Sequence, residues 1–348
     1  MKSVHLVIPD LFLPRELARR VCGGMQLPAL ENLLARGVFT SPAHAAGPVQ
    51  PGEAMCLENR LCELFGQPHP EGRQTDAPIA AISARFDRLG EGCWLRADPV
   101  YLHLDQNRML LSSVTPSAGD ARAMCASLNE HFAGQGMAFF APHPQRWYLR
   151  TEALPRIRTI PMSQMMGANV GDALPAGGEA ARWHGIFNEI QMLLYSHPVN
   201  GAREARGELP VNSVWLWGGG CTAEVLLQRN FDSVSSDEVM AEMFAAESAV
   251  PFEPWHAQWQ GRQGHQLLVW SGLNAALQRG DLAGWRAALQ DFERSHAQPL
   301  WRALRAGGIA RLEIEAWGNG NDLSARLSRG DAWAFWRRAR PLERYSMV

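Results

Sequence analysis

The segment from residue 197 to residue 220 carries the side chains best suited to chemistry in this chain. It reads HPVNGAREARGELPVNSVWLWGGG, and the residues in it that could contact a ligand are His197, Asn200, Arg203, Asn212, Gly218, Gly219 and Gly220. An arginine guanidinium is a planar fork that can hold a carboxylate or a phosphate with two hydrogen bonds, and glycines after a strand let backbone N–H groups approach an anion. The segment therefore predicts contact with a small anion. The alternative is that the histidine caps a helix, the asparagines satisfy turns and the glycines bend the chain.

Charged residues also interrupt or close apolar runs elsewhere. Asp10 ends the run SVHLVIPD, and Arg96 and Asp98 lie within CWLRADPVYLHLD. A carboxylate at a strand end could be a metal ligand, but a single one is more typical of a helix N-cap, which is the interpretation we favour for Asp10. An opposite-charge pair inside an apolar strand is typical of a salt bridge at a domain junction.

Several kinds of catalysis have no signature in the sequence. Lys2 is the only lysine and no GxxxxGK[ST] is present, which argues against P-loop chemistry. The eleven histidines form no HExxH or HxH pattern, so we expect no bound metal. A Ser-His-Asp site would have no GxSxG turn to support it.

Composition limits the partners and the location of the protein. The net charge of −2 over 348 residues predicts neither a nucleic-acid partner nor a membrane-attracting surface, and the arginines and aromatics of AWAFWRRARPLERY near the end are interpreted as a solvated helix face. No run approaches roughly 18 apolar residues, the length of a membrane span. Six cysteines without CxxC spacing predict reduced, mostly buried thiols in a cytoplasmic protein.

Apolar runs alternate with helical patterns along the chain. Strands are expected at 3–10, 93–105, 213–217, 265–270 and 311–317, and helices at 27–37, 179–200, 236–248 and 281–305, the second of them ended by Pro198. This alternation predicts an α/β fold with a parallel sheet.

Several of these stretches together resemble one family. HPVN, an arginine, a glycine, PVN and VWLWGGG resemble a segment of the archaeal-type cofactor-independent phosphoglycerate mutases of the alkaline phosphatase superfamily, including a bacterial branch of phosphoglycerate-mutase-like or regulatory proteins. VIPD resembles the strand with the first metal aspartate, which falls on Asp10. CWLRADPVYLHLD resembles the strand with a substrate-contacting arginine, which falls on Arg96. The resemblance implies an alkaline-phosphatase-like core, residues 1–90 and 210–348, with an inserted α/β cap, residues 91–209.

The chain departs from this family where the family performs catalysis. GPVQPGEAMCLENRLCELFG resembles the loop and helix of the nucleophilic serine, but Glu53 and Ala54 stand where the serine is expected. Glu53 could act as a base, and we favour an ion pair with an arginine. VWSGLNAALQRGD replaces a strand that carries an aspartate and two histidines, and EAWGNG replaces an Asp-His end. Ser, Asn and Trp cannot substitute for such metal ligands.

Two hypotheses follow. The first is a catalytically degenerate protein without a cofactor, which binds a small anionic metabolite or a protein partner in a regulatory role. Its cleft would be lined by Arg96, the polar residues of the 197–220 segment and the triple glycine. The second is an active mutase that uses Mn²⁺ or Zn²⁺, so the sequence leaves open whether the chain is an enzyme.

Overall fold

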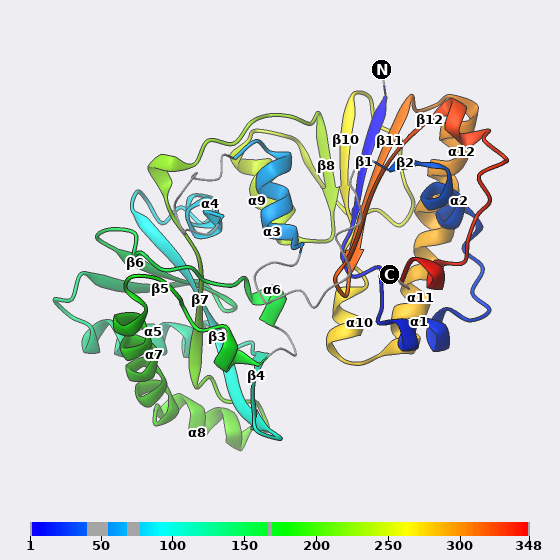
Figure 1. Ribbon diagram of the computed structural model, residues 1–348. Coiled ribbons are helices and arrows are strands. Elements are labelled where there is room, and N and C mark those ends of the chain that lie inside the picture. The colour runs from blue at the N-terminus through cyan, green and yellow to red at the C-terminus, as the bar shows by residue number, and fades with distance from the viewer. Residues whose placement is uncertain (1, 40–54, 68–76, 166–168, 347–348) are drawn as a thin grey trace. The chain divides into compact units, whose positions relative to one another are not determined.

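The computed structural model describes residues 2–39, 55–67, 77–165 and 169–346. The chain divides into two compact units (Figure 1): a first unit of Met1–Val49 and Gln228–Val348, and a second unit of Gln50–Leu227. The boundaries thus fall near residues 50 and 228, whereas the sequence had suggested 90 and 210. No helix in the described part of the chain combines the length and the apolar character needed to cross a membrane.

The first unit contains a seven-stranded sheet with a parallel centre. Its order is β2 (Val38–Phe39), β12 (Asn321–Ser328), β11 (Arg311–Gly318), β1 (Ser3–Ile8), β10 (His265–Val269), β8 (Ser233–Ser236) and β9 (Phe252–Pro254). The strands from β11 to β9 are parallel, and β12 and β2 are antiparallel to their neighbours. Five consecutive residues of β1 are buried, as expected for a strand covered on both faces. The predicted α/β fold with a parallel sheet is confirmed.

Helices of the first unit complete its core. They are α1 (Arg15–Cys22), α2 (Pro28–Arg36), α9 (Val239–Glu247), α10 (Asn274–Gln278), α11 (Leu282–Phe292), α12 (Gln298–Ala306) and the short α13 (Arg329–Ala332). Leu30, Trp285 and Leu300 pack with Leu6 and Ile314 of the sheet in one apolar cluster. A π-helical turn (Glu293–Ala297) joins α11 to α12, and its buried Glu293 accepts the backbone N–H groups of Ala29 and Leu30, both at 2.9 Å. This carboxylate satisfies open donors at the start of α2.

The second unit is built on an antiparallel sheet. Its order is β4 (Arg108–Ser113), β3 (Cys93–Asp105), β6 (Arg146–Thr151) and β5 (Met137–His143), and β7 (Ser213–Cys221) also pairs with β3. The sequence placed β7 in the parallel core, but its register with β3 sets Trp217 opposite Arg96. That assignment is wrong because an apolar run shows that a strand forms without showing which sheet receives it.

Helices cover both faces of this antiparallel sheet. On one face, α5 (Ala118–His131) and α7 (Ala180–Tyr195) pack with sheet residues such as Leu95 and Trp147, and α7 contributes Trp183. On the other, α4 (Ile79–Phe86) packs against Trp94 and Tyr148. Three more helices are α3 (Leu57–Leu64), α6 (Met162–Met165) and α8 (Pro198–Ala205). The sequence predicted that Pro198 ends the helix that became α7. Pro198 instead begins α8, because proline suits the first helical position.

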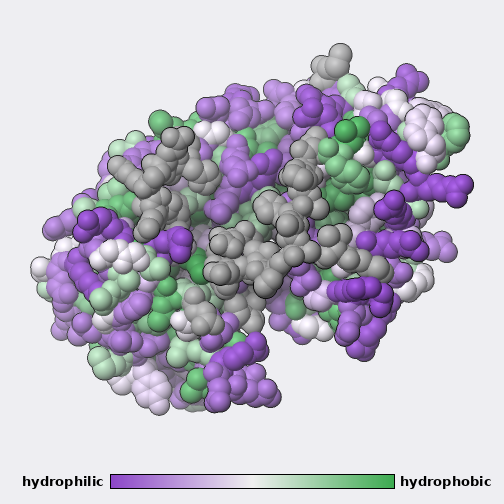
Figure 2. Space-filling model, viewed as in Figure 1, coloured by the Kyte–Doolittle hydropathy of each residue, from purple (hydrophilic) through white to green (hydrophobic). Residues whose placement is uncertain are grey.

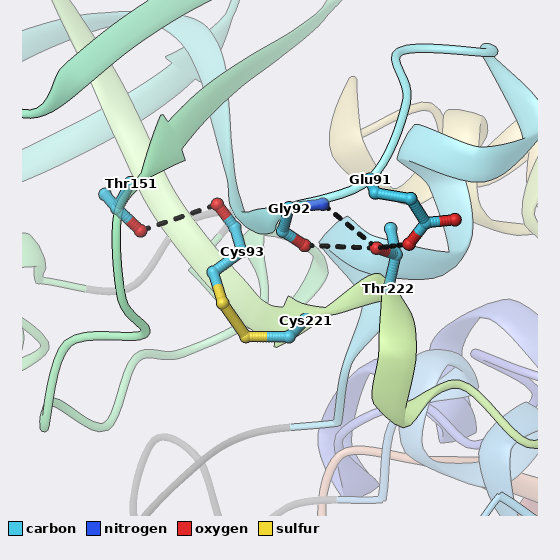
Figure 3. Close-up of a disulfide and its surroundings, with 6 residues drawn as sticks. All are labelled: Glu91, Gly92, Cys93, Thr151, Cys221 and Thr222. Atoms are coloured by element: carbon cyan, nitrogen blue, oxygen red, sulfur yellow. Dashed lines mark hydrogen bonds between the residues drawn. A yellow bond between two sulfur atoms is a disulfide. The ribbon is translucent and has the colours of Figure 1, made fainter.

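A disulfide joins the ends of β3 and β7. Cys93 and Cys221 are register partners with Cα atoms 3.9 Å apart (Figure 3). Beside them, the backbone N–H of Gly92 donates to the Thr222 hydroxyl at 3.0 Å. The prediction that all six cysteines are reduced is therefore wrong for this pair, whereas Cys22, Cys56, Cys62 and Cys125 are free and buried. The bonded pair is 128 residues apart in sequence, and only the β3–β7 register brings it together.

Candidate functional site

A buried ion pair lies at the centre of the antiparallel sheet. Arg96, which is 6% exposed, donates from Nε and Nη2 to Asp98 Oδ1 at 3.1 and 2.6 Å. Asp98 also accepts the indole N–H of Trp217 at 2.8 Å and the backbone N–H of Trp147 at 3.3 Å. The expected salt bridge is confirmed, although it lies inside the sheet of the second unit and not at a domain junction. The additional donors stabilise a carboxylate that burial alone would disfavour.

Aromatic rings hold the Arg96 guanidinium from both sides. The register pairs Arg96 with Tyr148 of β6 and with Trp217 of β7. The guanidinium carbon lies 5.4 Å from the centroid of the Tyr148 ring and 5.2 Å from that of Trp217, within cation–π range. Arg96 therefore occupies one fixed position, and its Nη1 has no hydrogen-bond partner among the described residues.

Tyr148 is itself held in place by an ion pair. Its hydroxyl donates to Asp87 Oδ2 at 2.5 Å, and Arg146 donates to both oxygens of the same carboxylate at 2.7 and 2.6 Å. Burial is the largest cause of the raised pKa of Tyr148, so the phenol stays protonated and donates. The side chain that packs on Arg96 is thus fixed at both ends.

A buried acid lies near this cation. Glu58, in the first turn of α3, is 7% exposed, and its Oε2 has no hydrogen-bond partner in the described part of the chain. Burial raises its pKa, whereas hydrogen bonds from Ser163 and Cys56 and the charge of Arg96 act to lower it. Sequence reasoning missed Glu58. The available signal was a charged residue on the same helical face as the apolar residues Leu61 and Cys62.

The triple glycine lies at the end of β7, where the strand meets other backbone closely. Gly218 has a φ of +64°, and its N–H donates to the Thr159 hydroxyl at 3.1 Å. A Cβ added at Gly220 would lie 2.8 Å from Pro78 Cα at the start of α4. Backbone conformation therefore accounts for Gly218, and close packing of a helix accounts for Gly220.

Gly219, the middle residue of the three, is less constrained than its neighbours. It is half-buried, and a Cβ added there would lie 3.1 Å from a methyl carbon of the Leu154 side chain and 3.6 Å from one of Leu95. Side-chain carbons can move further than backbone atoms, so packing requires a glycine here less strictly than at Gly220. These contacts of Gly218, Gly219 and Gly220 are with the chain itself, and their contact with an anion stays a prediction.

His197 and Asn200 serve the local structure around α8. His197 is the N-cap residue of α8, where its Nδ1 accepts the N–H of Val199 at 3.3 Å, and burial lowers its pKa. The Asn200 amide donates to two backbone carbonyls, those of Leu194 at 2.7 Å and Val211 at 2.9 Å. The alternative given for these residues, in which the histidine caps a helix and the asparagine satisfies local backbone groups, is confirmed.

Arg203 and Asn212 are likewise engaged within the chain. Arg203 donates to the carbonyl of Leu209 at 3.0 Å and lies 3.1 Å from a Glu208 oxygen. The Asn212 amide exchanges two hydrogen bonds, both of 2.8 Å, with the backbone of Leu102 in β3. Among the described residues, no hydrogen bond or ion pair joins either of them to Arg96, so their contact with a ligand also stays a prediction.

Asp10 follows the first strand of the parallel sheet. It has a φ of +59° and accepts the amide N–H of Asn274 at 2.8 Å, and burial raises its pKa more than this bond lowers it. The favoured N-cap role is wrong, because Pro14 occupies the N-cap position of α1 and no side chain caps that helix. Three residues separate Asp10 from Pro14, which is too far for the expected cap.

More acids lie at the same carboxyl edge of the parallel strands. Ser271, after β10, donates its backbone N–H and its hydroxyl to Asp237 Oδ1 at 2.8 and 3.1 Å. The N–H of Asn274 donates to the Ser271 carbonyl at 2.9 Å, which continues the network to Asp10. Sequence reasoning missed Asp237 and Glu238, although both directly follow β8. Burial raises the pKa of Asp237.

The metal ions that the family resemblance implies do not fit this edge. The described residues contain no group of three or more His, Cys, Asp or Glu arranged to hold a metal ion. Asp10 and Asp237 are each hydrogen-bonded to a neutral side chain instead. Glu53 lies outside the described residues, so its expected ion pair stays a prediction.

Comparisons with known proteins bear out the resemblance. No protein-family model matches the chain. A probable 2,3-bisphosphoglycerate-independent phosphoglycerate mutase of Geobacter sulfurreducens is 36% identical over 61 residues, 18% of this chain and 15% of that protein. The 2,3-bisphosphoglycerate-independent phosphoglycerate mutase of Methanosarcina barkeri is 26% identical over 106 residues, 30% and 27% of the two chains. The matches thus cover well under two thirds of these relatives, and the chain is related to cofactor-independent phosphoglycerate mutases at low identity.

Solved structures match over most of the chain. The PH0037 protein from Pyrococcus horikoshii aligns with a TM-score of 0.52 at 11% identity, covering 94% of this chain and 87% of that one. A cofactor-independent phosphoglycerate mutase from Thermoplasma acidophilum aligns with a TM-score of 0.45 at 15% identity, covering 95% and 90%. The likeness to PH0037 shows a shared α/β fold.

Proposed function

We propose that this chain is a phosphoglycerate-mutase-like protein that binds a small phosphorylated or carboxylated ligand and transfers no phosphoryl group. Arg96 is the binding residue in this proposal, and the observation that carries it is its buried guanidinium, whose Nη1 has no hydrogen-bond partner in the part of the chain that the structure describes. Nε and Nη2 donate to Asp98, and the rings of Tyr148 and Trp217 lie against the guanidinium. Nη1 can therefore bind an anion with little loss of side-chain conformational entropy. A regulatory role in the cytoplasm, exerted through this ligand or through a protein partner, completes the proposal.

The carboxyl edge of the parallel sheet supports the absence of catalysis. Phosphoryl transfer in this superfamily relies on divalent metals that activate the nucleophile and neutralise the transferring group. Here Asp10 is bonded to Asn274 and Asp237 to Ser271, both neutral partners. The segments that replace the family's ligands carry Ser, Asn, Trp and Gly instead of Asp and His.

An active mutase is the second candidate. Asp10, Asp237 and Glu238 do follow parallel strands at one sheet edge, where ligands of α/β proteins commonly bind. In this alternative Mn²⁺ or Zn²⁺ would complete the site together with residues outside the described ranges.

A ligand titration with matched variants tests the proposal. Thermal unfolding is followed with added 3-phosphoglycerate or sulfate for the wild type, Arg96→Lys and Arg150→Lys. A ligand at a hundred times its Kd stabilises by about 2.7 kcal/mol. We expect this shift in the wild type and in Arg150→Lys, whose arginine is exposed on β6, and its loss in Arg96→Lys, which keeps the charge without the fork.

A coupled assay for interconversion of 3- and 2-phosphoglycerate, with metal analysis, separates the two candidates. Turnover with stoichiometric Mn²⁺ or Zn²⁺ would establish the active mutase. A wild-type melting temperature that neither anion changes would refute binding at Arg96.

A further inference from the structure

Three large aromatic side chains protrude from the first unit after α13. Trp333, Phe335 and Trp336 are 54%, 78% and 69% exposed, while the neighbouring Ala332 and Ala334 are buried. Figure 2 shows that hydrophilic side chains cover most of the visible face, with green side chains scattered among them. Among the exposed large apolar side chains of the described residues, no other three lie within four positions of the sequence.

These rings are held in defined positions. Ser328 and Asp331 form a capping box on α13. Arg337 donates to the carbonyl of Arg36 at 2.7 Å and lies 3.4 Å from Asp331, which anchors the segment after the rings. A short, anchored turn carries the rings outward, so no large loss of chain freedom is needed to present them.

Arginines accompany the rings. The guanidinium of Arg305 on α12 lies 4.2 Å from the Trp333 ring centroid, and the exposed Arg338 and Arg340 follow Trp336 by two and four positions in the sequence. Residues 329–344 hold five arginines and two carboxylates in a chain with a net charge of −2. We call Trp333, Phe335, Trp336, Arg305, Arg338 and Arg340 the aromatic–arginine patch.

The positive charge of this patch is only partly neutralised. Of the two carboxylates in the segment, Asp331 already pairs with Arg337. The pKa of the Arg36 guanidinium nearby is lowered, first by burial and then by the charge of Arg305. The guanidinium groups of Arg36 and Arg305 are therefore close enough to interact, and an anionic surface at Arg305 would relieve their repulsion.

We propose that the aromatic–arginine patch docks on an anionic lipid surface. Tryptophan and phenylalanine rings favour the membrane–water interface, where an apolar body meets a polar environment, and each exposed arginine gains from anionic headgroups. A second copy fits poorly, because a symmetric contact would bring two sets of arginines together. The net charge of the whole chain gave no sign of such a surface because it averages over a local excess of arginine.

Vesicle co-sedimentation with the full chain tests this proposal. The probes are vesicles of phosphatidylcholine alone and of an equal mixture with phosphatidylglycerol, at low and high salt. We expect binding to the mixed vesicles only, weakening as salt rises. Arg338→Gln with Arg340→Gln should weaken it about thirtyfold, and Phe335→Ala with Trp336→Ala at least about tenfold.

Matched controls come from the second unit. Arg122→Gln with Arg156→Gln removes two exposed arginines, and Met192→Ala with Tyr195→Ala removes two exposed apolar side chains. Binding should be unchanged in both, and far-UV circular dichroism verifies that every variant is folded. The proposal is overturned if mixed vesicles are not bound, if phosphatidylcholine binds equally, or if the controls lose as much as the patch variants. Binding to heparin or duplex DNA without binding to vesicles would likewise overturn it and indicate a polyanion.

Discussion

The Arg96 cluster and the carboxyl edge of the parallel sheet position polar groups in opposite ways. Arg96 and Asp98 stand inside a strand, and the register of β3 with β6 and β7 fixes what surrounds them. Asp10, Asp237, Ser271 and Asn274 stand beyond strand ends and are held chiefly by hydrogen bonds to one another. The first arrangement is rigid and desolvated, whereas the second depends on short side chains in loops.

This difference bears on function. A guanidinium that rings and a carboxylate already orient can accept an anion without reorganising. Carboxylates that must gather around a cation need to face one point, and here two of them face neutral partners. The proposal of ligand binding at Arg96 without phosphoryl transfer rests on this difference.

The largest effect is expected from breaking the buried pair. Arg96→Met leaves Asp98 buried without its cation and removes two cation–π contacts, so the free energy of unfolding should fall by about 3–5 kcal/mol. Urea denaturation followed by tryptophan fluorescence measures it. In Arg96→Met combined with Asp98→Asn the loss should be smaller, since no uncompensated charge remains.

Arg150→Met is the matched control, because this exposed arginine of β6 also contacts a tryptophan ring, Trp94. Its unfolding free energy should change by less than about 1 kcal/mol. Equal losses in the two arginine variants would show that register and burial do not distinguish Arg96, and the contrast between the two regions would fail.

A smaller effect tests whether packing accounts for the triple glycine. Gly220→Ala places a methyl group against Pro78, and overpacking of this kind costs about 1–3 kcal/mol. Gly185→Ala, in an exposed position of α7 with open space around it, should instead stabilise by about 0.5–1 kcal/mol. Urea denaturation compares them. A tolerated alanine at Gly220 would mean that packing does not require this glycine and would leave an anion as its explanation.

Local patterns in the sequence predicted the features that local physics determines. Periodicity located strands such as β1 and helices such as α2 within a residue or two. The Arg96–Asp98 salt bridge follows from residue types two positions apart. The helix cap at His197, which the sequence predicted only as the alternative to anion contact, follows from the proline beside it. Such features depend on neighbours in the chain, which a single sequence displays.

Long-range pairing determined the rest. The sheet that receives β7, the Cys93–Cys221 disulfide and the neighbours of Arg96 all depend on a register between segments far apart in sequence. Burial of Glu58 depends on how α3 packs within the second unit. The spacing of residue types along one sequence does not show which distant segments pair or pack. Sequence reasoning therefore placed β7 in the wrong sheet and missed Glu58.

The smallest effect is expected at the carboxyl edge. Ser271→Ala removes one hydroxyl donor from Asp237, while the backbone N–H of residue 271 still donates at 2.8 Å. The free energy of unfolding should therefore fall by only about 1 kcal/mol, close to the effect of Ser196→Ala, an exposed serine that bonds a carbonyl of α7. Urea denaturation of both variants provides the measurement. A loss several times larger for Ser271→Ala would mean that this edge is as tightly constrained as the Arg96 cluster, because only a rigid, desolvated network transmits the loss of one bond to its other members.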